Sequence, residues 1–240
     1  MYNLSFASAH QLFEQWVVLH PEDPRGPLFD AAAYLFSEFE RMRILQSDFF
    51  LEDDNFREGR RPGPDNSVRQ RFEAALLRAD TLADAVLAKS PNDRTALFSK
   101  VMARGLEADY EALIAKQEFR AVASIKTARQ TADRLLSIHP DCYDAHLAAG
   151  VENYLLSQRL APVRWVLRLG GVGTDKEKGL SELRIVAENG NYLQPYAKLL
   201  LAVAALRDNN RAEARRLLQD LASRYPLNPL YREELRKIGS

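Results

Sequence analysis

The chain has 240 residues, enough for one or two domains, and its 33 basic residues balance its 33 acidic residues. A net charge of zero gives no global field that would favour nucleic acid or an anionic membrane as a partner. A hydrophobic content of 46% with 28% charged residues is typical of a globular protein and argues against a disordered or collagen-like chain. The single cysteine, Cys142, excludes an internal disulfide, and the longest strictly apolar run, 199–206, is too short to span a bilayer.

The N-terminal segment 6–20 predicts the first helix, because apolar side chains such as Phe13, Trp16 and Val17 recur three or four positions apart. Residues 1–60 carry five arginines and no lysine against eleven acidic residues, so the charge is unevenly spread along the chain. In the repeat frame described below, this helix is the second of a repeat whose first helix is missing. We therefore expect either a fragment of a longer protein or a leader immediately upstream.

The rest of the chain keeps the helical period, and strand-like alternation bounded by turn residues is absent from the sequence. Asp93 and Asn210 are predicted N-caps, and Thr174 with Glu177 is predicted to form a capping box. We expect an all-α protein with about ten or eleven helices of ordinary length.

Four segments share one frame, in which a small residue is followed by apolar residues four and seven positions later and by a proline twelve positions later. They are Ala9, Phe13, Trp16 and Pro21; Ala79, Ala83, Val86 and Pro91; Ala128, Ala132, Leu135 and Pro140; and Ala214, Leu218, Leu221 and Pro226. The first three positions lie on one helical face, and the proline ends one helix and begins the next.

A second kind of helix is predicted after each proline, with a small residue at the position where a partner helix would press. These residues are Ala31, Val101, Gly150 and Ala202. Paired helices of this pattern resemble the tetratricopeptide repeat, a helix-turn-helix unit, and the resemblance covers most of the chain. It implies a right-handed solenoid of helical hairpins that binds partners on its concave side.

The proline intervals of 70, 49 and 86 residues exceed the family's period of about 34, which predicts insertions between repeats. We expect a single domain over 1–240 with an inserted loop at 51–67 and an irregular insertion at 157–173. A polar capping helix is predicted over 228–240.

The sequence offers only weak signals for a catalytic or metal site. Gly170, Gly171 and Gly173 lack the Gly-Lys-Ser/Thr ending of a phosphate-binding loop, so a helix-to-helix turn is the favoured interpretation. The acidic run 52–54 has neither the spacing of a calcium loop nor a partner carboxylate, and no Gly-x-Ser-x-Gly elbow occurs. His139, Cys142 and His146 could form a metal site only across a proline break, so a helix-junction cluster is the favoured interpretation. We predict no cofactor.

The basic segments also have alternative interpretations. The arginines around the long loop are offset by acidic neighbours, which argues against nucleic acid as a partner; they are Arg57, Arg60, Arg61, Arg69 and Arg71. The segment 159–168 could lie at a membrane interface as a basic amphipathic turn, but packing of Trp165 onto the solenoid is the favoured interpretation.

The strongest candidate site is the apolar face of the helices that follow each proline. If the repeats stack as in the resembled family, that face lines the concave side and forms a partner-binding groove. Its residues are Leu28, Phe29, Leu35, Phe98, Met102, Leu147, Val151, Tyr154, Tyr196, Leu199 and Val203. The same side chains would instead be core if the insertions or a tighter curvature fill the groove.

Three functions remain open at this point. The first is a non-catalytic interaction module that binds a partner protein segment in the apolar groove. The second is an enzyme or small-ligand binder that uses a cavity between the solenoid and its insertions, around Tyr154, Trp165 and the glycine turn. The third is an envelope-associated adaptor with peripheral membrane contact.

The resemblance suggests a bacterial origin. We expect a periplasmic or envelope-associated protein if a leader was removed, and a cytoplasmic protein otherwise, since a lone cysteine is compatible with either compartment. The sequence gives no indication of the oligomeric state.

Overall fold

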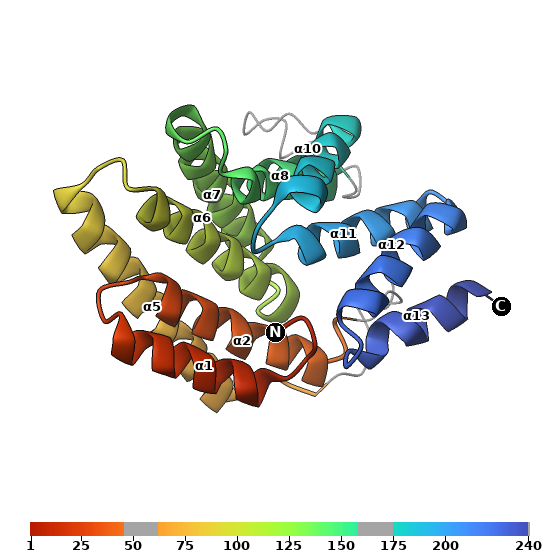
Figure 1. Cartoon of the computed structure of the whole chain (residues 1–240), viewed down its shortest axis with the longest axis horizontal. Coiled ribbons are helices and arrows are strands. Elements are labelled where there is room, and N and C mark those ends of the chain that lie inside the picture. The colour runs from red at the N-terminus through yellow and green to blue at the C-terminus, as the bar shows by residue number, and fades with distance from the viewer. Residues whose placement is uncertain (46–61, 158–174, 240) are drawn as a thin grey trace.

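The computed structural model describes residues 1–45, 62–157 and 175–239, and within these ranges it contains helices and turns but no strand (Figure 1). The predicted all-α class is confirmed. The described helices are α1 (Phe6–Leu19), α2 (Arg25–Arg41), α5 (Asn66–Lys89), α6 (Arg94–Asp109), the π-helical segment η1 (Tyr110–Ile114), α7 (Glu118–Ile138), the 3-10 segment η2 (Tyr143–Ala145), α8 (His146–Ser157), α10 (Lys176–Asn189), α11 (Gln194–Arg207), α12 (Arg211–Arg224) and α13 (Pro229–Gly239).

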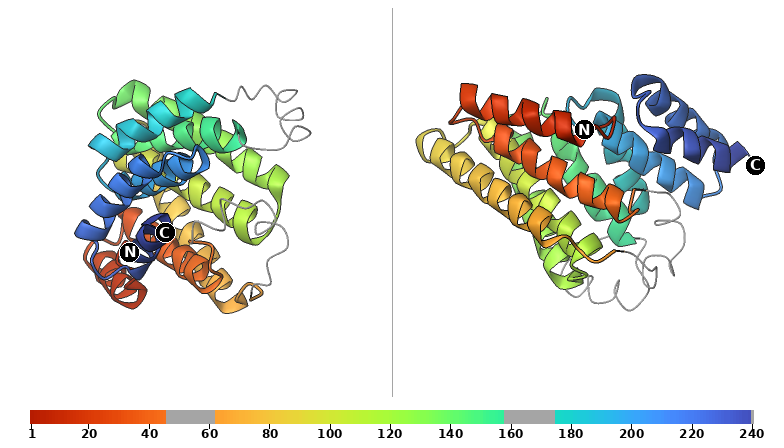
Figure 2. Two further views of the ribbon diagram at one scale, coloured as in Figure 1. Left: turned by 90° about the vertical axis from the view of Figure 1, so that its right-hand side faces the viewer. Right: turned by 90° about the horizontal axis from the view of Figure 1, so that it is seen from below.

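Each described α-helix packs against the next described α-helix along the chain, from α1 on α2 to α12 on α13. The row of helices curves, and the start of α1 lies near α11 and α13 in the views of Figures 1 and 2. Two clusters of buried apolar residues fill the interior, one mainly in α2, α5 and α6 and the other from α6 to α13. Met102 packs against both clusters, so the interior continues across α6.

The repeated frame occurs five times rather than four. Gly179, Leu183 and Val186 occupy its three apolar positions on α10, and all three are buried. Asn191 stands where the other copies have proline. The sequence did not indicate this copy, because asparagine replaces the proline that marks the other four.

The frame helices end in the same way. The backbone N–H of the residue after each helix donates to the carbonyl oxygen of the third frame position, as from His20 to Trp16 and from Ser90 to Val86. In four copies proline then follows, which is tolerated because its missing N–H has no role at that point. The first frame position is buried in every copy, where a small side chain allows close approach of the next helix.

Two of the three predicted helix caps are confirmed. The Asp93 side chain accepts a hydrogen bond from Ala96 N, and the Asn210 side chain accepts one from Glu213 N. The predicted capping box at Thr174 is wrong by one residue. Asp175 is the N-cap of α10 and accepts from Lys178 N, which is reasonable because a carboxylate caps at least as well as a hydroxyl.

The predicted insertions lie largely outside the described residues. The loop predicted over 51–67 ends earlier than expected, because α5 begins at Asn66, where Asp65 caps it by accepting from Ser67 N and Val68 N. Of the segment 157–173, only Ser157 is described, as the last residue of α8. The helix predicted over 228–240 corresponds to α13.

Candidate functional site

A cavity of about 330 Å³ lies on the inner side of the curved helical row. Each helix that follows a hairpin turn, namely α2, α6, α8, α11 and α13, contributes to its wall. The residues that line it are Met1, Tyr2, Leu4, Phe6, Phe13, Phe29, Ala32, Phe36, Leu45, Met102, Gly105, Leu106, Asp109, Leu147, Tyr192, Leu193, Pro195, Tyr196, Leu199, Asn228, Leu230, Tyr231 and Glu234. We call this space the central cavity. Its lining is mainly apolar and aromatic.

The structure separates the predicted groove residues into three sets. Five of them line the central cavity together, although they come from four different helices: Phe29, Met102, Leu147, Tyr196 and Leu199. Four others are at most 4% exposed and belong to the packed interior: Leu28, Leu35, Phe98 and Tyr154. Val151 and Val203 are half-buried and do not line the cavity.

The N-terminal residues form a wall of the cavity that the sequence did not indicate. The Tyr2 hydroxyl donates to Tyr192 O at 2.8 Å, and Asn228 Nδ2 donates to Tyr2 O at 2.9 Å. Leu227 N donates to Asn3 Oδ1 at 3.2 Å. These bonds connect residues that are 190 to 226 positions apart in the chain, and no local sequence pattern encodes them.

Aromatic rings in contact make up much of the cavity wall. Phe29 lies 5.1 Å from Tyr192 and 5.9 Å from Phe13 between ring centroids, and Phe36 packs edge-on against Tyr196 at 5.7 Å. Rings at these separations attract one another. The pairs between α2 and the α11 region therefore stabilise two sides of the cavity against each other.

Asp109 is the acidic group on the α6 wall. Met102, Gly105 and Asp109 follow one another at helical spacing on the same face of α6, so the carboxyl group ends an otherwise apolar stripe. Burial raises the pKa of Asp109 to about 7, and a hydrogen bond with Tyr196 opposes the rise. Burial also raises the pKa of Tyr196 well above its usual value.

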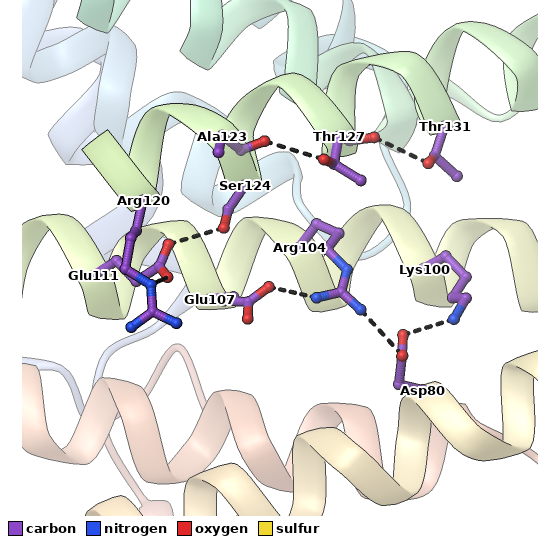
Figure 3. Close-up of polar contacts among 10 residues, drawn as sticks. All are labelled: Asp80, Lys100, Arg104, Glu107, Glu111, Arg120, Ala123, Ser124, Thr127 and Thr131. Carbon is purple, nitrogen blue, oxygen red and sulfur yellow. Dashed lines mark hydrogen bonds and ion pairs between the residues drawn. The ribbon is translucent and has the colours of Figure 1, made fainter. Parts of the chain in front are cut away.

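The opposite face of α6 is polar, as Figure 3 shows. Asp80 of α5 pairs with Lys100 at 2.9 Å and with Arg104 at 3.0 Å between nitrogen and oxygen. Further along, Ser124 of α7 donates to the buried Glu111 of η1 at 2.8 Å. Because these ion pairs and hydrogen bonds lie toward α5 and α7, the face of α6 that carries Met102 is left for the cavity.

A smaller hollow of about 220 Å³ lies at the hairpin turns and is partly lined by Arg25 and Arg94. The Arg25 guanidinium already pairs with Asp23 at 2.7 Å, and Arg94 pairs with Asp141 at 2.7 Å. These internal partners neutralise the two cations, so the hollow offers little free charge to a ligand.

Of the alternative sites that the sequence suggested, only the cluster of His139, Cys142 and His146 lies wholly within the described residues. His146 Nδ1 lies 2.6 Å from Glu182 Oε2, His139 Nε2 lies 2.8 Å from Asn92 O, and Cys142 is buried. No group of three metal-ligating side chains occurs in the part of the chain that the structure describes. Trp165, the glycine turn and the basic segment 159–168 lie outside the described residues. Among the described helices, none is both long and apolar enough to cross a membrane.

A comparison with models of known protein families found no match, and a comparison with curated protein sequences found none either. The functional proposal therefore depends on the geometry of the central cavity.

Proposed function

We propose that the protein is a non-catalytic, tetratricopeptide-like binding module that receives apolar side chains of a partner protein segment in the central cavity. The observation that carries this proposal is the cavity itself, about 330 Å³ of space with mainly apolar and aromatic walls. Binding sites in proteins are commonly concave, largely apolar and equipped with a few polar groups. The central cavity has this composition.

The repeat pattern supports the same proposal. We take the helical row to be a right-handed solenoid of helical hairpins, as the resemblance implies. The interval from Asn191 to Pro226 is 35 residues, close to the family's period of about 34. The helices after each turn supply cavity residues, which corresponds to the concave face of the resembled family.

The size of the cavity limits what it can take. It fits one or two large side chains rather than a whole helix, so we expect a short anchor motif in the partner. Full burial of one leucine or phenylalanine side chain contributes about 1.5–3 kcal/mol. The remaining affinity and the orientation would come from charged residues at the edge of the site.

Gly105 provides a way to fill the cavity without disturbing the fold. It lines the cavity, and nothing lies within 4 Å of the place where its Cβ would be. The substitution Gly105→Leu therefore adds volume to the cavity and improves helix propensity. We expect a graded loss of binding from Gly105→Ala to Gly105→Leu, about tenfold or more for leucine, because the new side chain competes with the ligand for space.

The experiment is a selection of random displayed peptides on the purified chain, followed by affinity measurements on the variants. Gly63→Leu makes the same substitution at an exposed position where nothing lies within 4 Å, away from the cavity, and serves as the matched control. Selected peptides with a shared large apolar residue that lose affinity only with Gly105→Leu would support the proposal. Peptides that bind Gly105→Leu as well as the wild type would overturn it.

A free apolar small molecule is the second candidate ligand. The observation that favours it is the wall formed by Met1, Tyr2, Leu4 and Phe6, which closes one side of the cavity and leaves less room for a continuing polypeptide. Native mass spectrometry of the purified protein tests this candidate. A bound mass that is present on the wild type and absent from Gly105→Leu would favour it, whereas unliganded protein in both samples would count against it.

A further inference from the structure

The carboxyl group of Asp109 has no basic side chain as an ion-pair partner among the residues that the structure describes. No lysine, arginine or histidine among the described residues forms an ion pair with it, and the neighbour that interacts with it is the hydroxyl of Tyr196. An ionised carboxylate without a counter-charge is costly in apolar surroundings. Among the residues that the structure describes, no basic side chain therefore compensates the Asp109 carboxylate.

The other ionisable groups around the cavity do not take this role. Glu234 of α13 also lines it, but its carboxylate is 2.9 Å from Lys237 Nζ and is therefore compensated. Burial lowers the pKa of the α-amino group of Met1, so this group loses its charge more easily than usual. The remaining ionisable side chains that face the cavity are phenols: Tyr2, Tyr192, Tyr196 and Tyr231.

The walls suit a cation that carries an apolar stem. Phe29, Phe36 and Tyr192 present aromatic rings to the cavity, and the faces of such rings attract cations. Met102 and Gly105 form an apolar stripe on α6 that leads to Asp109. A ligand whose apolar stem lies along this stripe would place its cationic end at the carboxylate. The open space at Gly105 lies on this path.

We infer that the central cavity selects a primary ammonium group on an apolar stem, with Asp109 as the residue that binds the ammonium and the aromatic wall as the surface that binds the stem. This inference rests on the proposed function and names the chemistry of its ligand. Two sources share that chemistry, a lysine side chain between apolar residues of a partner and a free hydrophobic amine.

The first experiment compares phenylbutylamine with phenylbutanol, which have the same stem, by calorimetric titration of the full chain near pH 8. At this pH the amine carries its positive charge, because primary amines titrate near 10.4. Asp109 is mostly ionised at the same pH, because its pKa is about 7. We expect the amine to bind the wild type about tenfold more tightly than the alcohol, since hydrogen bonds to charged groups are the stronger ones. Asp109→Asn should remove the difference and keep the binding of the alcohol.

Asp133→Asn is the matched control, because it removes one negative charge from an exposed position of α7 that is remote from the cavity lining. It should leave the preference for the amine unchanged. In the wild type the preference should also fall as the pH is lowered from 8 to 6, because protonation of Asp109 removes the charge that the ammonium recognises. If Asp109→Asn does not fold, the same titration is made on the chain with an acetylated N-terminus, because the α-amino group of Met1 also gains charge over this pH range and would lower the preference as well.

The two sources are distinguished by a second pair of probes. An acetylated Leu-Lys-Leu peptide amide is compared with its norleucine counterpart, which keeps the stem but lacks the amine. Preference for the lysine peptide over the norleucine peptide assigns the site to a protein partner, whereas a preference found only with phenylbutylamine assigns it to a free amine.

Failure of the inference and failure of the proposed function give different results. If amine and alcohol bind the wild type equally, or if Asp109→Asn leaves their ratio unchanged, the inference is wrong and the cavity remains a binding site. If neither pair of probes binds the wild type, or if Gly105→Leu binds all of them normally, the proposed function itself is wrong.

Discussion

Asp109 illustrates how a single side chain can be held in an unfavourable state by the fold. Its carboxyl group lies in the cavity wall, where burial raises its pKa to about 7 from the ordinary value of 3.8. The unfolded chain loses this proton near pH 4, whereas the folded chain keeps it until near pH 7. Folding is therefore penalised as the pH rises through this window, and the full penalty applies above pH 7.

The substitution Asp109→Asn should remove this penalty. Asparagine has nearly the same shape but no charge, so we expect the variant to gain about 1–3 kcal/mol of unfolding free energy near pH 8. The gain should shrink toward zero below about pH 3, where the wild-type carboxyl is protonated in both states. Urea unfolding of both proteins at several pH values measures the difference, and a gain that is independent of pH would contradict the assignment.

Asp144 shows the opposite case, a buried carboxylate that the fold satisfies. Its two oxygens accept hydrogen bonds from the backbone N–H groups of Asn191, Tyr192 and Leu193 at 3.0–3.1 Å, just before α11. Asp144→Ala should cost about 2–4 kcal/mol, because three buried or half-buried donors lose their partner. Asp93→Ala removes a single capping bond to Ala96 N and should cost about 1 kcal/mol. Equal losses in denaturant unfolding would mean that α11 does not depend on Asp144.

At the scale of the elements, two glycines allow a close contact between α8 and α10. A Cβ on Gly179 would lie 2.5 Å from Tyr154 N, whereas a Cβ on Gly150 would lie 2.7 Å from Leu183 Cδ2. Backbone atoms yield less readily than the end of a leucine side chain. The two glycines therefore make the same contact possible but should differ in their tolerance of substitution.

We predict that Gly179→Ala lowers the free energy of unfolding by about 2–3 kcal/mol, and that Gly150→Ala lowers it by less than about 1 kcal/mol. Gly150→Leu overpacks the same contact and should cost about 1–3 kcal/mol. Gly105→Ala is the reference, because its Cβ meets open space and the gain in helix propensity should stabilise α6 by up to about 1 kcal/mol. Equal tolerance at Gly179 and Gly105 would show that α8 and α10 are not in close contact.

Elements were predictable from the sequence where their signals are local. The caps at Asp93 and Asn210 depend on one side chain and on N–H groups within three residues, so the sequence reveals them. The fifth copy of the frame was missed because Asn191 stands where the other copies have the proline that ends the pattern. Gly179 is explained only by the approach of Tyr154, which a single helix cannot reveal.

The central cavity belongs to the scale of the whole molecule. The sequence predicted only part of its lining. Helical spacing predicts that Phe29, Met102 and Tyr196 lie on the inward faces of their helices, and all three line the cavity. Phe98 fits the same spacing, but its side chain is buried. Which of these side chains faces open space depends on how strongly the row curves. That curvature depends on contacts such as the one between Tyr2 and Tyr192, which are 190 residues apart.

Contacts between distant elements also bear on how the molecule unfolds. In a linear array each repeat touches only its neighbours, so a weak end frays without affecting the other end. Here Tyr2 is bonded to Tyr192 just before α11 and to Asn228 just before α13, and Phe29 of α2 packs on Tyr192. The two ends of the row should therefore lose protection together when the N-terminal contact is weakened.

Tyr2→Ala tests this coupling and should cost about 2–4 kcal/mol, whereas Tyr2→Phe keeps the ring, removes one hydrogen bond and should cost about 1 kcal/mol. Native-state hydrogen exchange distinguishes the two architectures. In a closed row, Tyr2→Ala speeds exchange in α1 and also in α11 and α13, at the far end of the chain. Phe119→Ala removes a ring that is 83% exposed and should change neither end. Faster exchange confined to α1 would mean that the row behaves as an open array, and the cavity would then lack the N-terminal wall that limits the size of its ligand.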